Sequence, residues 1–376
     1  MNNYPLGEIP PGSYFTRTVF LEDDFILATP EMPFSPELLD IIKSWRFKEV
    51  FSDGEPRENY TAAALDDEKN PRAFPTSDGE RIKQVEEFYF AFQKYAERLF
   101  TQLVIRNNLK FEPVAEKIKT ACEVVRQERR YLLRVLKNTE PPPDQNYLTS
   151  HAVRSTIIAI IIGSYLKLPS HRLIELGVAA LLHEVGMIKL SPQIYLSKRP
   201  LTPPERKKIL THPVLGYKLL NTFDFPLAVS VVALEHHERE NGSGYPRKLT
   251  GDKITIYAKI IAVACSWEAL SVNRPHKEAK DGYVGMLELL KNEGKQYDET
   301  VIRALVYSLS IYPIGLYVLL SNDKKAQVVD VNPENPRFPI VQILGEFTPD
   351  GKNKTLETSA EDISILRPLT REEMDA

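Results

Sequence analysis

Residues 235–246 read EHHERENGSGYP and place two adjacent histidines, His236 and His237, directly before a glycine-rich turn. Adjacent imidazoles are costly to bury, because each ring needs a polar partner. One metal ion for each ring would satisfy both, so the pair indicates a metal site. The glycines and the proline that follow indicate that the chain turns here.

The other histidines extend this pattern along the chain. Five of the seven histidines fall at intervals of about one helix and loop, each in or beside an apolar run: His151, His183, His212, His236 and His237. Helical bundles supply metal ligands in this way, from several facing helices. A lone histidine of this kind is more often a core or surface residue than a ligand. Five together, with one adjacent pair, predict a dinuclear metal site.

Apolar periodicity in the middle of the chain predicts helices joined by short loops. The predicted helices span residues 81–108, 113–139, 147–168, 170–187, 203–220, 226–238 and 255–272. This pattern favours a mainly α protein whose core is an all-helical bundle. The long charged helix at 113–139 either turns its charges to solvent or pairs with a second copy of the chain, and the sequence favours neither.

Changes in composition divide the chain into five predicted parts. These are a small α+β module (1–55), a polar linker (56–80), the helical region (81–311), a small β appendage (312–345) and a polar, loosely ordered tail (346–376). Residues 301–320 are apolar enough to resemble a membrane span. Arg303, Pro313 and Gly315 instead predict a buried helix that ends, turns and continues as a strand.

Five motifs give the chain a resemblance to a known family. In order they are SHAVRS at 150–155, ALLHEVGM at 180–187, THPVLGYKLL at 211–220, HHERENGSGYP at 236–246 and AVACSWEALSVNRPHK at 262–277. Their order, spacing and flanking apolar pattern resemble an HD-GYP domain, with its core at about 112–311. This family is the branch of the HD phosphohydrolases that cleaves cyclic di-GMP, and its fold is an HD-type helical bundle.

The resemblance implies a metal-dependent phosphodiesterase that opens cyclic di-GMP to pGpG and then to GMP. It implies two divalent transition-metal ions, iron or manganese, which activate water and clamp the phosphate. The residues at the ligand positions are His151, His183, Glu184, His212, His236, His237 and Cys265. Glu184 also takes a catalytic position, because a bridging carboxylate offsets the positive charge of two ions.

Three central positions depart from the family pattern. Glu184 replaces an aspartate and carries its carboxylate one methylene further out. Met187 occupies the catalytic position of a lysine and offers no cation to the scissile phosphate. Cys265 replaces the last aspartate of the pattern. A thiolate binds zinc or iron well, so Cys265 is a candidate ligand, and a cysteine that only packs in an apolar helix is the alternative.

Five residues are candidate substrate ligands: Gly244, Tyr245, Pro246, Lys259 and Arg274. Tyr245 is suited to packing on a guanine or a ribose, and equally to packing within its own turn. Arg274 matches an arginine of the family's last motif, which suits a phosphate. The alternative for Arg274 is an exposed arginine at the end of a helix.

Composition limits the partners and the compartment. The 376 residues are 43% apolar and 26% charged, with a net charge of −3, so there is no basic field for DNA or an acidic membrane. The two cysteines, Cys122 and Cys265, lie far apart and suggest a reducing compartment. The N-terminal sequence MNNYPLGEIPPGSYF lacks the features of a signal peptide. We therefore expect a cytoplasmic protein, and a homodimer or a signalling-protein partner stays open.

Two functions are compatible with these observations. The complete histidine set favours an enzyme that hydrolyses cyclic di-GMP. The changes at positions 184, 187 and 265 favour a degenerate module that binds a nucleotide, a metal or a protein without turnover. Motifs alone do not decide between them.

Overall fold

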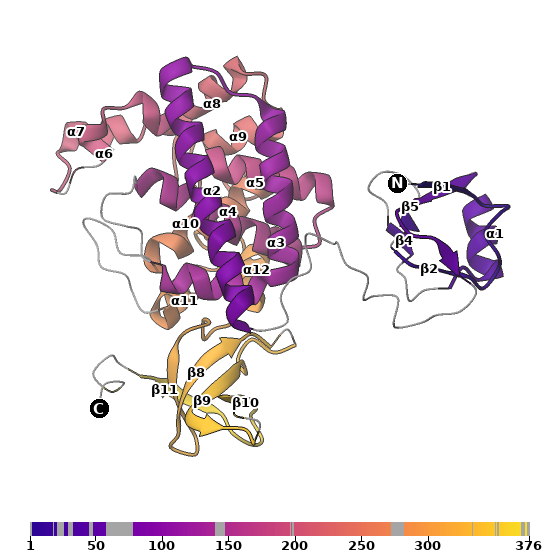
Figure 1. Cartoon of the computed structure of the whole chain (residues 1–376). Coiled ribbons are helices and arrows are strands. Elements are labelled where there is room, and N and C mark those ends of the chain that lie inside the picture. The colour runs from indigo at the N-terminus through magenta and orange to yellow at the C-terminus, as the bar shows by residue number, and fades with distance from the viewer. Residues whose placement is uncertain are drawn as a thin grey trace. The chain divides into compact units, whose positions relative to one another are not determined.

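The structure is a computed structural model, and it divides the chain into two compact units, Met1–Phe74 and Pro75–Ala376 (Figure 1). The residues that the structure describes are 2–17, 19–20, 26–28, 33–44, 48–57, 78–139, 147–195, 197, 199–271, 282–332, 334–349, 351, 353–369 and 373.

The first unit is the predicted small α+β module. Its antiparallel sheet has the order β1 (Asn2–Pro5), β5 (Glu49–Ser52), β3 (Val19–Phe20) and β4 (Ile26–Ala28). Helix α1 (Pro36–Ser44) supplies Leu39 and Ile42 to a small apolar core that also contains Phe15 and Val50. The module is longer than the predicted 1–55, because β6 (Pro56–Arg57) pairs with β2 (Tyr14–Phe15).

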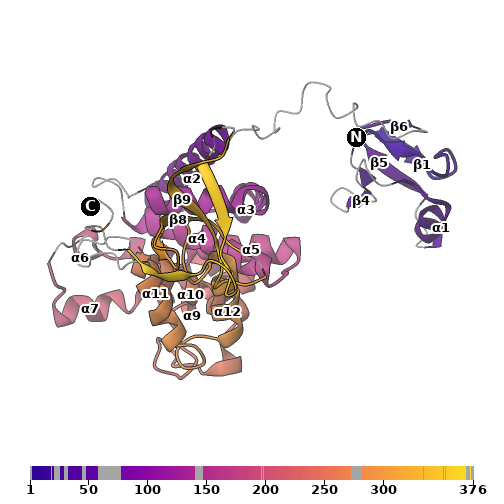
Figure 2. The same cartoon turned by 90° about the horizontal axis from the view of Figure 1, so that it is seen from below.

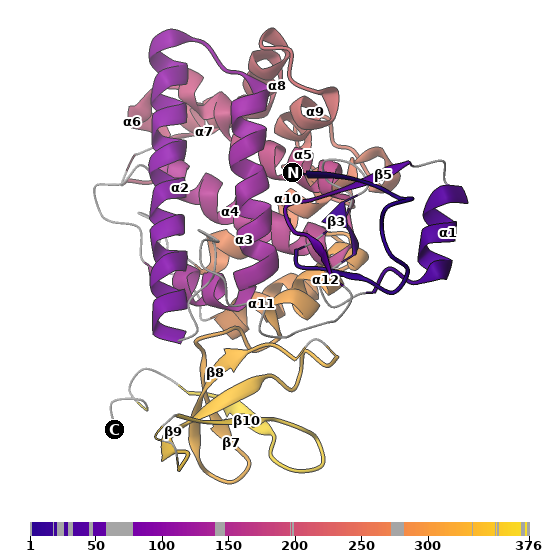
Figure 3. The ribbon, with the colours of Figure 1, turned by 45° about the vertical axis from the view of Figure 1, so that its right-hand side comes forward.

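The second unit is built around a buried helix, α4 (Tyr147–Tyr165), whose apolar run leaves residues 148–163 without an exposed face. Two long helices, α2 (Asp78–Arg106) and α3 (Phe111–Asn138), pack side by side and against α4 (Figure 3). Helices α5 (Ser170–Leu182), α10 (Ile256–Ser271) and α12 (Glu299–Leu309) also contact α4, and α9 (Leu227–Glu235) and α11 (Gly282–Lys291) pack on α10. The predicted helical bundle is confirmed.

Two predicted helices end earlier than the sequence pattern suggests. The helix predicted at 170–187 ends at Leu182, and a 3₁₀ helix, η2 (Val185–Lys189), follows after a turn. The helix predicted at 203–220 is two helices, α7 (Pro203–Ile209) and α8 (His212–Thr222). Pro213 explains the second break, because it lacks an amide proton and its ring clashes with the preceding turn of a continuous helix. Short helix α6 (Pro192–Tyr195) precedes α7.

The β appendage is larger than predicted. Its sheet has the order β10 (Asn353–Glu357), β9 (Ile340–Phe347), β8 (Lys325–Asp330), β7 (Tyr317–Leu320) and β11 (Ile365–Pro368). It lies across one end of the helices, and its inner face shares their apolar core (Figures 1 and 2). The predicted loosely ordered tail at 346–376 is therefore wrong for β10 and β11. Both are held by backbone pairing, which requires no alternating apolar residues.

The apolar segment at 301–320 behaves as predicted. It forms α12 within the core, turns at Tyr312–Gly315 and continues as β7. Among the described residues, none of the helices has both the length and the apolar character of a membrane span. The predicted linker at 56–80 falls mostly on residues outside the described ranges, and α2 begins at Asp78.

Candidate metal centre

Two groups of metal-binding side chains lie in the core of the helical unit. The first group is Glu184, His212, His236 and His237, and the second is His151, His183 and Cys265. Within each group the ligand atoms lie within 4.8 Å of one another. All seven sequence-predicted ligands are therefore brought together, in two sets.

The first group is assembled from helix ends and turns. Glu184 lies in the turn between α5 and η2, and His212 is the first residue of α8. His236 follows the last residue of α9, and His237 comes next in the turn. The break between α7 and α8 matters here, because it puts His212 at the start of a helix, close to the end of α9.

The second group comes mainly from helix interiors. His151 lies on α4 and Cys265 on α10, while His183 caps the C-terminal end of α5. The Sγ of Cys265 is 3.2 Å from Nε2 of His183, which is itself 3.3 Å from Nε2 of His151. Helices α4 and α10 pack directly on each other, so this group is fixed by the bundle itself.

The hydrogen bonds of the imidazoles show which nitrogen faces the centre. The Nδ1 atoms of His183 and His212 each lie 2.6 Å from a backbone carbonyl oxygen, of Ala180 and Ile209. A carbonyl only accepts, so both Nδ1 atoms are donors, and the Nε2 atoms of the neutral rings carry lone pairs. Metal-binding histidines are oriented in this way.

His236 and His151 follow the same rule. Nδ1 of His236 is 3.1 Å from the carbonyl oxygen of Ala233, and Nδ1 of His151 is 2.5 Å from Oε2 of Glu268. Their Nε2 atoms consequently face other Nε2 atoms, with His212 and His236 only 3.2 Å apart at these nitrogens. Facing lone pairs repel unless a cation lies between them.

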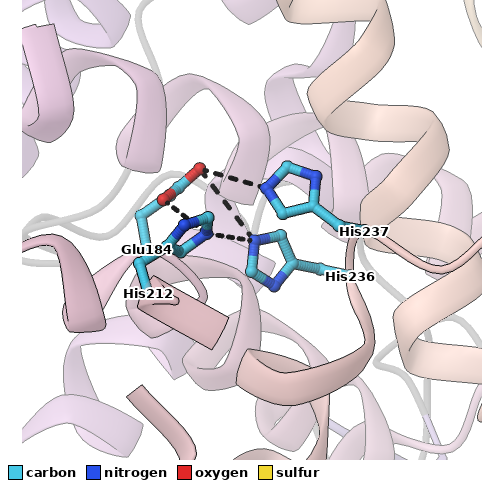
Figure 4. A group of neighbouring side chains, drawn as sticks. All are labelled: Glu184, His212, His236 and His237. Carbon is cyan, nitrogen blue, oxygen red and sulfur yellow. Dashed lines mark hydrogen bonds and ion pairs between the residues drawn. The ribbon is translucent and has the colours of Figure 1, made fainter. Parts of the chain in front are cut away.

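The carboxylate of Glu184 is directed at the three histidines of the first group (Figure 4). Its Oε2 is 3.2 Å from Nε2 of His212, and its Oε1 is 3.9 Å from Nε2 of His183 in the second group. Nε2 of His237 is 4.0 Å from the same Oε1. Oε2 is buried and accepts no hydrogen bond from the described residues. A buried carboxylate oxygen facing unprotonated nitrogens fits a metal ion.

The first group favours neutral rings around one anion. Burial lowers the pKa of His237 to about 3 and holds the pKa of His236 well below its usual value. Burial alone would raise the pKa of Glu184, but the surrounding imidazoles, His212 first, outweigh it and lower the pKa to about 2. The group thus offers lone pairs and a carboxylate, which are ligands for a metal.

The second group favours positive charge. Burial alone would lower the pKa of His151, but Glu268 and Cys265 outweigh it and raise the pKa to about 10. Burial likewise opposes ionisation of the Cys265 thiol, yet His183 and His151 lower its pKa to about 6. The thiolate and Glu268 together create a place for a cation, which a metal ion would fill in place of protons.

Glu268 is a candidate positioning residue that the sequence analysis missed. It is 2% exposed and accepts from Nδ1 of His151, so it orients this candidate ligand without belonging to either group. It lies three residues after Cys265 on α10, on the same helix face. That spacing was the available signal. Such carboxylate–histidine pairs fix the ring orientation at metal sites.

The Gly-Tyr-Pro loop supports His237. The ring of Tyr245 stacks on His237 with centroids 4.6 Å apart, and its amide donates to the carbonyl of His237. A Cβ on Gly244 would lie 2.4 Å from that carbonyl oxygen, so only glycine allows this approach. Pro246 follows Tyr245 through a cis bond. These contacts favour the packing role of Tyr245, while substrate contact by the three residues stays a prediction.

The remaining predicted site residues are Lys259, Arg274 and Met187. Nζ of Lys259 is 3.1 Å from carboxylate oxygens of both Glu240 and Asp298, an ion-pair network that braces the loop after His237. Its charge is already balanced, which argues against a phosphate ligand. Arg274 falls outside the described residues. Met187 lies on η2, half-buried, and its amide donates to the carbonyl of Glu184.

Comparisons with known proteins agree with this arrangement. Residues 143–301 match the family described as "HD domain". A cyclic di-GMP phosphodiesterase of Borreliella burgdorferi is 28% identical over 204 residues, 54% of each chain. A second, of Pseudomonas aeruginosa, is 30% identical over 199 residues, 53% of this chain and 48% of the relative. The chain therefore spans about half the length of the curated relatives it matches.

A solved structure extends the similarity of fold beyond the matched domain. An HDG"Y"P protein from Bdellovibrio bacteriovorus superposes with a TM-score of 0.51 at 17% identity, over 81% of this chain and 97% of that one. The match to the HD domain family covers all seven clustered side chains and the Gly-Tyr-Pro loop that follows His236 and His237, and it supports an HD-GYP-type domain in this part of the chain.

Proposed function

We propose that the protein is a metal-dependent phosphodiesterase that hydrolyses cyclic di-GMP to pGpG and GMP, with two divalent transition-metal ions, iron or manganese. The observation that carries the proposal is the position of Glu184. Its carboxylate approaches imidazoles of both groups, with Oε2 3.2 Å from Nε2 of His212 and Oε1 3.9 Å from Nε2 of His183. The names of the relatives, which are cyclic di-GMP phosphodiesterases, support the choice of substrate.

When bound, two such ions supply an activated water and a positive clamp for the phosphodiester. The chain's residues position that chemistry. Oε2 of Glu184 faces His212, while Oε1 lies at a similar distance from His183 and His237. His237 lies on the more open side, with a side chain 25% exposed. The imidazoles of the second group are almost completely buried. We therefore expect the phosphodiester to approach from the side of His237.

Hydrolysis of cyclic di-GMP by the full chain tests the proposal directly. Protein purified without chelator, anaerobically, should convert the cyclic dinucleotide to pGpG and GMP, as separated by chromatography. His236→Ala and His237→Ala should each reduce bound metal and abolish turnover. Metal at full occupancy with no turnover of cyclic di-GMP would contradict the proposal.

A degenerate binding module is the second candidate, and Met187 is the observation that favours it. At the position of the family's lysine this side chain offers no charge to a phosphate. Lys259, the nearest alternative that the sequence suggested, is already paired with two carboxylates. Calorimetry separates the two functions. A module should bind cyclic di-GMP stoichiometrically and return it unchanged.

Two further predictions concern the whole protein. We propose a cytoplasmic location, because the two cysteines lie far apart in the sequence and suggest a reducing compartment. A homodimer or a signalling-protein partner also stays a prediction. Both are tested by fractionation of cells and by the mass of the protein in solution.

A further inference from the structure

We infer that the two positions of the centre take chemically different metal ions. The group of His151, His183 and Cys265 binds a thiophilic ion such as zinc, while the group containing Glu184 binds a harder ion such as manganese or iron. This inference rests on the proposed dinuclear centre. The departure from the family pattern on which it depends is Cys265 in place of the last aspartate.

The second group is a compact site with two nitrogen donors and one sulfur donor. Sγ of Cys265 and Nε2 of His151 lie 3.2 and 3.3 Å from Nε2 of His183. Three protein ligands of this kind, with a fourth position left open, are a known arrangement for zinc. Thiolates and imidazoles select zinc and related ions, whereas carboxylates and water suit manganese.

Glu268 does not supply a hard ligand to this group in place of the missing aspartate. Its Oε2 is 2.5 Å from Nδ1 of His151, on the side of the ring that faces away from the centre. The hydrogen bond strengthens His151 as a nitrogen donor. Cys265 thus remains the anionic ligand that this group contributes itself, and it is soft.

The first group has the opposite chemistry. It combines three imidazoles with the carboxylate of Glu184, and it contains no sulfur. Oε2 of Glu184 faces His212, whereas Oε1 points toward the boundary with His183, at 3.9 Å. The sulfur of Cys265 is therefore the one soft donor in the two groups, and it belongs to the second.

The chain carries its own control in Cys122. This cysteine lies on α3, packed against the apolar core, and belongs to neither group of ligands. Burial raises the pKa of its thiol to about 12, so it stays a thiol. A signal that depends on a metal-bound thiolate must come from Cys265 and survive Cys122→Ser.

Cobalt(II) is the probe that locates the ion, because a cobalt–thiolate bond produces a charge-transfer absorption that imidazole and carboxylate ligands do not. Metal-free full-length protein is titrated with cobalt under anaerobic conditions. We expect this absorption to grow with added cobalt and to saturate at one cobalt per chain. It should be absent from Cys265→Asp and Cys265→Ser, and unchanged in Cys122→Ser.

Zinc and manganese are then compared by how well each ion protects the thiol of Cys265 from alkylation. One equivalent of zinc should protect Cys265, and manganese alone should not, as mass spectrometry of the peptide would show. Zinc affinity should fall at least about tenfold in Cys265→Asp, the lower end for disturbing a metal's surroundings. A circular dichroism spectrum confirms that each variant is folded.

If a variant fails to fold, the cobalt absorption and the alkylation of the wild-type protein are sufficient to test the inference. Two bound cobalt ions without the thiolate absorption would overturn it, as would equal protection of Cys265 by zinc and manganese. Turnover of cyclic di-GMP is measured separately. A thiolate-bound cobalt in a protein that never hydrolyses the substrate would refute the proposed function and leave the metal inference intact.

Discussion

The two groups of ligands in the metal centre are built from different parts of the fold. The first group depends on three chain breaks, after α5, before α8 and after α9. The second depends chiefly on the packing of α4 against α10. Turns move more easily than packed helices. Under the proposed function, we expect the first group to set access and catalysis and the second to anchor one metal ion.

The two groups also differ in the protonation that their surroundings favour. Burial keeps His236 and His237 neutral by lowering the pKa of both rings. In the second group, Glu268 and Cys265 raise the pKa of His151 against the effect of burial. One group is thus poised to donate lone pairs, and the other already attracts a cation. Glu184 links them, since its oxygens face both.

Replacing Glu184, which links the two groups, should have the largest effect on turnover. Glu184→Gln keeps the shape of the side chain but removes the charge that both groups share. We expect turnover to fall by about 10²–10³-fold, the cost of losing one electrostatic group in an active site. The thiolate–cobalt absorption should persist, because Cys265 is untouched. Its loss together with activity would show that the two groups are not separable.

A backbone change should damage the first group selectively. A Cβ on Gly186 would lie 2.0 Å from the carbonyl oxygen of His212 and 2.6 Å from the amide nitrogen of Gly216. Backbone atoms cannot yield as side chains do, so Gly186→Ala should destabilise the fold by about 3 kcal/mol, the upper end for overpacking. Denaturant titration measures the change.

The matched control for this change is Gly285→Ala on α11. There the added Cβ meets side-chain carbon atoms of Leu270 and Trp267 at 3.4 and 3.6 Å, which is ordinary contact. Alanine also favours a helix over glycine by about 1 kcal/mol. We expect an unchanged or slightly higher stability. Equal destabilisation by both variants would contradict the idea that Gly186 is needed for the close approach of η2 to α8.

Glu268→Gln should lower the metal affinity of the second group and leave that of the first group unchanged. Removing the carboxylate that orients a metal-binding histidine typically costs about 10–100-fold in metal affinity. The loss should appear in the cobalt titration as weaker binding of the ion with the thiolate absorption. Glu175→Gln is the control, because Glu175 accepts a hydrogen bond from Tyr257 and touches neither group. An identical effect of the two variants would reduce Glu268 to a general packing role.

The sequence predicted the ligands better than their surroundings. The adjacent pair His236-His237 and the regular spacing of the other histidines follow from residue type alone, and all seven ligands come together. The orientation of each ring does not, because it is set by carbonyl groups such as those of Ala180 and Ile209. Glu268 was missed because a carboxylate behind a ligand has no motif of its own.

The boundaries of the elements were predictable only in part. Pro213 was a visible signal for the break before α8, yet the apolar pattern continued through it. Strands β10 and β11 carry few apolar residues, and neighbours distant in sequence hold them in place. Periodicity reports which side chains face the core, and it reports little about pairing between backbones.

The smallest expected effect belongs to Met187→Lys, which tests whether the first group lacks only a cation. Met187 lies in the same short helix that follows Glu184, and its amide donates to the carbonyl of Glu184. Because that turn is fixed by its backbone, a lysine there would start from a defined position near the carboxylate. We expect turnover of cyclic di-GMP to rise about tenfold, a modest share of what a charge aimed at a phosphate contributes. Met187→Gln has a similar length without the charge and should leave the rate unchanged. A gain in both variants would point to side-chain volume, and no gain with metal fully bound would place the deficit at Glu184 or Cys265.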